Sequence, residues 1–143
     1  MPIKRLAYAT AALSNNMTWE SNIALAEQVA FDVSRGIPAN GHWAMCLDKA
    51  TRILRNGDFA ALSGPKVEPF ARALLGDQNA AVIDRWMWRA AFGENPPSLT
   101  FKRHREVAVA LRRLAKIVHR PVVDVQAITW LVVQRLFAAP LTE

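Results

Sequence analysis

The sequence is poor in residues that several protein classes need. Only one of its 143 residues is a cysteine. A lone cysteine builds neither an internal disulfide nor a cysteine-rich metal or iron–sulfur site. Cys46 lies in an apolar stretch, which favours a buried structural thiol over a nucleophile. The three histidines, His42, His104 and His119, have no ligand spacing with Cys, Asp or Glu. We therefore expect no metal site and no cofactor.

Long apolar runs are also missing. Residues 1–13 carry Lys4 and Arg5 before a short apolar run, and polar residues follow, which favours a first helix over a signal peptide. The most apolar segment, 122–137, contains five polar or charged residues and is too short to span a bilayer. These observations predict a cytoplasmic protein without membrane contact.

Strand-like alternation is absent as well, whereas apolar residues recur at helical spacing along the whole chain. Thr18 is a candidate N-cap, and glycines such as Gly57 and Gly93 are helix stops. The predicted helices are 3–13, 19–34, 43–55, 65–75, 84–93, 101–119 and a buried one at 121–137. With no linker or repeat, the sequence predicts an all-α fold, a single compact domain over 1–143 with seven or eight helices.

Positive charge is what the sequence has in excess. The formal net charge is +6 and the sequence pI is about 10.2. This favours an acidic partner, nucleic acid before an anionic membrane, although a merely soluble basic domain fits equally well. In the helix at 101–119 basic residues gather on one side, namely Arg105, Arg112, Arg113 and Lys116. The apolar residues expected opposite them are Val107, Leu111, Leu114 and Val118.

Residues 60–93 carry a candidate chemical site. Gly64 and Pro65 precede Lys66 at a predicted helix start, and Asp84 opens the next helix. Free N–H groups at a helix start bind phosphate, and the positive helix end favours a neutral, nucleophilic amine. An Asp held nearby can face a cation developing at a sugar carbon. The simpler interpretation is that Asp84 is only a helix N-cap and that Lys66 is only a solvated lysine.

This segment resembles the hairpin and catalytic loop of the helix-hairpin-helix DNA glycosylase superfamily, in its endonuclease III-like branch. There a Lys and an Asp eighteen residues apart form the catalytic pair, as Lys66 and Asp84 are spaced here. Gly64 stands at the family's glycine two residues before the Lys. Leu62 replaces the first hairpin glycine, and Arg85 follows the Asp where the family has Thr. The four-cysteine cluster loop of that branch is missing.

A second block, residues 12–18, resembles the family's Leu-Ser-x-Gln-x-Thr at the start of the helix that lines the base pocket. The resemblance implies that Asn16 fills the gap left by a flipped base and that Ser14 and Trp19 line the base pocket. Trp43, Trp86, Trp88 and Trp130 are expected in the core or the pocket wall. The chain also looks like short phage-encoded relatives, in which case the cytoplasm would be that of the host.

The resemblance implies a DNA-binding base-excision enzyme, a DNA glycosylase with lyase activity through a Lys66 Schiff base and with Asp84 stabilising the cationic transition state. The expected partner is duplex DNA, bound by Gly64, Asn16, Arg85, Arg112, Arg113 and Lys116. Two alternatives stay open. One is a phage transferase that hypermodifies bases on the same fold, and the other is a non-catalytic DNA-binding protein.

Overall fold

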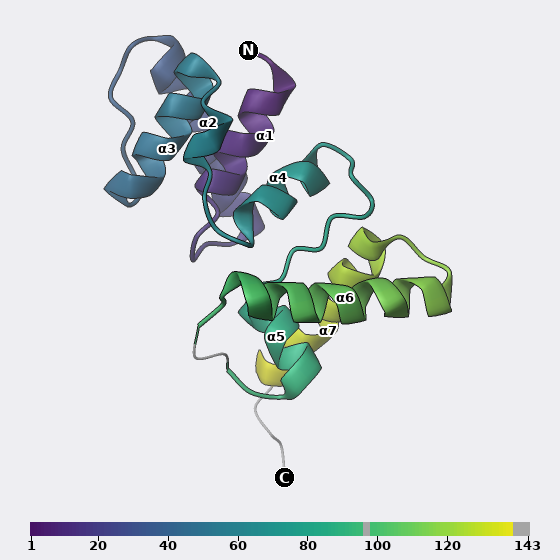
Figure 1. The fold of residues 1–143 in the computed structure, drawn as a ribbon. Coiled ribbons are helices and arrows are strands. Elements are labelled where there is room, and N and C mark those ends of the chain that lie inside the picture. The colour runs from purple at the N-terminus through teal and green to yellow at the C-terminus, as the bar shows by residue number, and fades with distance from the viewer. Residues whose placement is uncertain (96–97, 139–143) are drawn as a thin grey trace. The chain divides into compact units, whose positions relative to one another are not determined.

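The chain is all-helical, as the sequence predicts. A computed structural model describes residues 1–95 and 98–138, and within them it contains seven α-helices, one 3-10 turn and no strand (Figure 1). Their bounds are α1 Ile3–Ala12, α2 Trp19–Ser34, α3 Ala44–Asn56, the turn η1 Phe59–Ala61, α4 Val67–Leu74, α5 Arg85–Phe92, α6 Phe101–Val118 and α7 Val122–Ala138.

The helices begin and end near the capping residues and glycines that the sequence predicts. The Thr18 side chain accepts a hydrogen bond from the Ser21 N–H and caps α2. Gly57 and Gly93 end α3 and α5 with φ of 69° and 72°, in the left-handed region where glycine has no steric penalty. Most helix boundaries therefore lie within a residue or two of those predicted.

The start of α4 is the exception. The sequence predicts a helix from Pro65, but α4 begins at Val67 and Lys66 is its N-cap residue. Pro69 explains the shift, because proline has no N–H to donate. In a helix starting at Pro65 it would be the fifth residue, whose N–H is needed, whereas here it is the third, whose N–H has no helical partner.

The chain divides into two compact units, residues 1–75 and 76–143, each with its own core. The prediction of one domain over the whole chain stays a prediction. We describe each unit by itself.

In the first unit α1 packs against α2, α3 and α4. Its buried side chains are mostly alanines, which let neighbouring helices approach closely. α1 runs antiparallel to α3. Arg5 near the start of α1 donates to the Leu54 and Arg55 carbonyls at the end of α3, each at 3.0 Å. Asn15, just after α1, lies 3.5 Å from the Cys46 sulfur near the start of α3, and Cys46 is a buried thiol as expected.

In the second unit α7 packs against α5 and α6, and a buried segment outside any helix, residues 80–83, precedes α5. This segment is held by side chains of both long helices. The Val82 N–H donates to the Gln126 side chain of α7 at 2.8 Å, and the Ile83 N–H donates to Nε2 of His104 on α6 at 3.4 Å. These bonds satisfy backbone groups that no sheet partner reaches.

Two burial predictions are wrong. The segment 121–137 is predicted to be buried, but only one side of α7 is, and Ile128, Leu131 and Val132 are each about half exposed. Trp43 is predicted to lie in the core or a pocket wall, yet it is 54% exposed and stacks on His42 instead. The hydropathy of a sequence does not determine how many sides of a helix pack against other elements. None of the helices in the described ranges is long and apolar enough to cross a membrane.

The anchoring of His104 generates a prediction about acid stability. Burial lowers the pKa of His104 and the positive charge of Arg112 acts in the same direction, while a backbone hydrogen bond with Ala81 opposes them. The unfolded chain therefore takes up the proton at higher pH than the folded chain, near 6.5. The stability that His104 contributes is complete above about pH 6.5 and is lost as the pH falls through its lowered folded pKa. Urea unfolding between pH 8 and 5 should show a smaller acid loss for His104→Gln than for the wild type.

His119→Asn is the matched control. His119 is exposed at the end of α6 with φ of 54°, a conformation that asparagine tolerates. This variant should keep the acid loss of the wild type. An unchanged loss in His104→Gln would contradict the assignment.

Candidate nucleic-acid interface

Helix α6, the longest in the described residues, separates an apolar side from a basic side. Thr100 caps its start by accepting from the Arg103 N–H. Its buried side chains are Val107, Ala108, Leu111 and Ala115. The predicted apolar side is partly wrong, because Leu114 and Val118 are 44% and 45% exposed. Ala108 and Ala115 contact the core instead, because the buried side of α6 is rotated toward these two residues.

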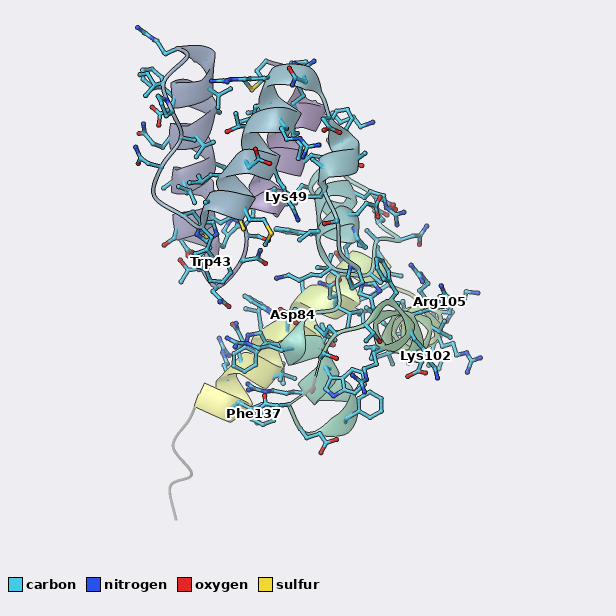
Figure 2. All side chains as sticks on the ribbon, turned by 60° about the vertical axis from the view of Figure 1, so that its left-hand side comes forward. Trp43, Lys49, Asp84, Lys102, Arg105 and Phe137 are labelled. Carbon is cyan, nitrogen blue, oxygen red and sulfur yellow. The ribbon has the colours of Figure 1, made fainter. Side chains whose placement is uncertain are left out.

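The opposite side of α6 is what we call the basic face. It consists of five exposed residues, Lys102, Arg105, Arg112, Arg113 and Lys116. The predicted gathering of Arg105, Arg112, Arg113 and Lys116 on one side is confirmed. Lys102 and Arg105 project from α6 on the side away from Asp84 (Figure 2).

One carboxylate, that of the exposed Glu106, lies one helical turn after Lys102 beside the basic face, and it forms no ion pair with these cations in the described residues. The ion pairs of Arg52 with Asp48 and Asp58, and of Arg72 with Glu68, lie in the first unit and involve no residue of the basic face. The Arg103 guanidinium donates to the Ser98 carbonyl and hydroxyl and lies over the Trp88 ring, and within the basic face Arg112 donates to the Asn79 carbonyl at 3.4 Å. Arg103 therefore holds the loop before α6, whereas Lys102, Arg105, Arg113 and Lys116 are exposed to an anion.

A shallow cavity of about 410 Å³ continues the basic face at the end of α6. Four basic side chains line it, those of Arg112, Lys116, His119 and Arg120, together with Asn79, Ala115, Pro121 and Val122. None of these lining residues is acidic. Pro121 precedes α7 and Val122 is its first residue, so the cavity adjoins the start of α7, where the Val123 N–H donates to the Gln78 carbonyl at 3.3 Å. The charge of the side chains that line this cavity suits an anion such as a phosphate group.

Sequence reasoning placed Arg112 and Lys116 at the interface but missed His119 and Arg120. These two follow α6, at and after its C-cap, and they reach the cavity because His119 adopts a left-handed conformation that turns the chain into α7. The only sequence signal for His119 and Arg120 is a histidine that precedes Arg-Pro at the end of a predicted helix.

Asp84 is the N-cap of α5, and its carboxylate is engaged on both oxygens. Oδ1 accepts from the Trp86 and Met87 N–H groups, each at 3.0 Å. Oδ2 accepts from the indole N–H of Trp130 on α7 at 3.1 Å. The residue is half-buried. Arg85 beside it is exposed, and its guanidinium lies 5.7 Å from the centre of the Trp86 ring. Asp84 therefore joins α5 to α7, and this structural role does not depend on any catalytic role.

Lys66 belongs to the first unit and Asp84 to the second. Their spacing of eighteen residues crosses the boundary between units, so spacing alone does not bring them into one site. Lys66 follows Gly64, whose φ of 112° favours glycine, and the adjoining loop is tied to α3 by the Lys49 ammonium, which donates to the Ser63 hydroxyl at 2.9 Å.

The two residues expected to line a base pocket, Ser14 and Trp19, and Asn16, expected to fill the gap left by a flipped base, lie where α1 leads into α2. The Ser14 hydroxyl donates to the Ala11 carbonyl at 2.8 Å and so caps the end of α1. Asn16 is exposed with φ of 54°. Trp19, the first residue of α2, is 49% exposed and meets Phe70 of α4 edge to face, with ring centres 6.3 Å apart. Trp19 and Asn16 are therefore accessible to a partner, while Ser14 is occupied by the backbone.

The fold and this site define an all-helical protein with a charge-segregated basic helix. Comparison with known proteins shows the family to which the chain belongs. Residues 1–136 match the model of a family of unknown function, DUF7178, and the chain belongs to that family. No curated protein and no solved structure matches it.

The contacts of Asp84 predict what its substitution does to stability. Asp84→Ala removes the α5 cap and leaves the Trp130 indole N–H without its acceptor, so we expect a loss of about 1–3 kcal/mol. Asp84→Asn keeps one oxygen acceptor and should lose less than half as much. Urea unfolding followed by circular dichroism measures both. Equal losses would contradict the assigned hydrogen bonds.

Proposed function

We propose that this protein binds nucleic acid, with duplex DNA the expected form, through the basic face of α6 and the adjoining cavity. The observation that carries the proposal is a row of five exposed cations with no carboxylate paired to them in the described part of the chain. Binding of phosphates releases counterions, and this supplies much of the affinity of proteins for nucleic acid.

The dimensions of the basic face agree with this partner. From Lys102 to Lys116 the helix axis covers about 21 Å, which corresponds to about six base pairs of duplex DNA. The cavity beyond Lys116 would hold one further phosphate between Arg112, His119 and Arg120. Arginine is suited to this task because its planar guanidinium can donate two hydrogen bonds to one phosphate.

The test removes two charges from the basic face. We expect the double variant Arg113→Gln, Lys116→Gln to bind duplex DNA at least about tenfold more weakly and to lower the slope of log affinity against log salt by about 2, since each lost phosphate contact removes about 0.9. Fluorescence anisotropy at several salt concentrations measures both quantities.

The matched control removes two exposed arginines of the first unit, Arg35→Gln with Arg55→Gln. It has the same net charge as the test variant. The control should bind almost as the wild type does. If the two double variants lose affinity equally, only net charge matters and the basic face is not the interface.

The second candidate function is base excision, as the resemblance to DNA glycosylases implies. The observation that favours it is the placement of Asp84, a half-buried carboxylate fixed by three N–H donors at the start of α5. A carboxylate held in this way needs little reorganisation to face a cationic sugar. In the proposed reaction the neutral Lys66 amine attacks C1′, the bond to the base breaks, and the base leaves with a proton. The C1′–O4′ bond then breaks and O4′ takes up a proton, which leaves a Schiff base between Lys66 and C1′. Loss of a C2′ proton from this Schiff base eliminates the 3′ phosphate.

Borohydride trapping tests this candidate, because hydride reduces the Schiff base to a stable amine. With duplexes that carry damaged or hypermodified bases, the wild type and a Lys4→Ala control should form a covalent complex. Lys66→Ala should form none while still binding DNA. Trapping that persists in Lys66→Ala would exclude Lys66 as the nucleophile.

If the wild type binds DNA and no substrate gives an adduct, the lyase step is excluded. Mass spectrometry of the nucleosides then separates the remaining functions. A free base indicates a monofunctional glycosylase, a new modified base indicates a transferase, and unchanged nucleosides indicate a non-catalytic binder.

A further inference from the structure

The side of α7 that faces away from α5 and α6 is apolar at its centre and charged at its ends. We call it the outer face of α7 and define it by Asp124, Ile128, Leu131, Val132 and Arg135, all exposed. Ile128, Leu131 and Val132 are 53%, 54% and 51% exposed. The opposite side is buried at Val122, Val125 and Val133, so α7 is apolar all round near its middle.

A helix that is apolar on every side is normally covered on every side. Contiguous exposed apolar side chains on a folded domain mark an interaction surface. The outer face of α7 also differs from the basic face of α6 in its charge, because it carries one acid and one base and is neutral overall. Its partner is therefore expected to be apolar and neutral rather than an anion.

The outer face of α7 is complementary to a second copy of itself that runs in the opposite direction. Asp124, Ile128, Leu131 and Arg135 are spaced by four, three and four residues, so at about 100° per residue they form one stripe along the helix. When two copies of a helix pair antiparallel, residues whose numbers have a constant sum face each other. With a sum of 259, Ile128 faces Leu131 of the second copy and Asp124 faces Arg135 of the second copy.

We propose that the outer face of α7 is the interface of a twofold homodimer of this chain, with two antiparallel α7 helices at its centre. The apolar pairs are repeated by the symmetry axis, and each end of the interface is closed by an ion pair of opposite charges. This is the self-complementarity that an isologous interface requires. The contact extends over about three helical turns, so the interface is small and the dimer is weak.

Charge reversal tests the antiparallel pairing. In an Asp124→Arg homodimer two arginines meet at each end, and in an Arg135→Asp homodimer two aspartates meet. Each variant alone should dimerise about tenfold more weakly than the wild type in sedimentation velocity. An equimolar mixture of the two variants restores opposite charges at both ends and should form heterodimers as stable as the wild-type dimer. Neither a folding defect nor a different interface produces this rescue.

A second experiment tests the apolar centre. Ile128→Glu should be monomeric up to several hundred micromolar. Ile3→Glu, at an isoleucine of the first unit that is 75% exposed, should dimerise like the wild type. A wild-type protein that is monomeric at these concentrations overturns the proposal, and so does a dimer that persists in Ile128→Glu or a variant mixture without rescue. The proposal stands apart from nucleic-acid binding, which these measurements do not require.

Discussion

The carboxylate of Asp84 is the contact on which the second unit depends. A short helix such as α5 is not stable by itself, because eight residues form too few hydrogen bonds to offset the entropy of ordering them. Asp84 supplies acceptors for two of its first N–H groups and joins it to α7 through the Trp130 indole. Gln126 and His104 hold the preceding residues in the same way. The bend from the buried segment into α5 is thus fixed by side chains from α6 and α7.

The same packing separates the functions that we propose for α6 and α7. The side of each helix turned toward α5 is buried, and what remains outside differs in chemistry. α6 presents cations without carboxylate partners, whereas α7 presents an apolar stripe with one charge at each end. Because these surfaces belong to one packed unit, nucleic-acid binding and self-association can occur without competing for the same residues. A dimer through α7 would carry two basic faces, and simultaneous contact of both with one nucleic acid would strengthen binding by raising the effective concentration of the second face.

Asp84 also illustrates how a sequence motif and a structural role coincide. A residue that caps a helix and binds an indole is constrained by the fold alone, so its position in a motif is not by itself a sign of chemistry. An activity lost on its substitution would have two explanations. A comparison of Asp84→Asn with Asp84→Ala separates them, since the amide keeps an acceptor but not the negative charge.

Local sequence determined the helices. Caps and stops such as Thr18 and Gly93 act within one turn, so most ends of the helices could be predicted without any tertiary information, and the basic residues of α6 gather on one side because a helix has a fixed period. Tertiary packing decided the rest. It rotated the buried side of α6 toward Ala108 and Ala115, exposed one side of α7, and brought Trp130 to Asp84 across forty-six residues of sequence. Burial depends on which neighbours a helix side meets, and those neighbours are distant in sequence, so hydropathy alone could not reveal them.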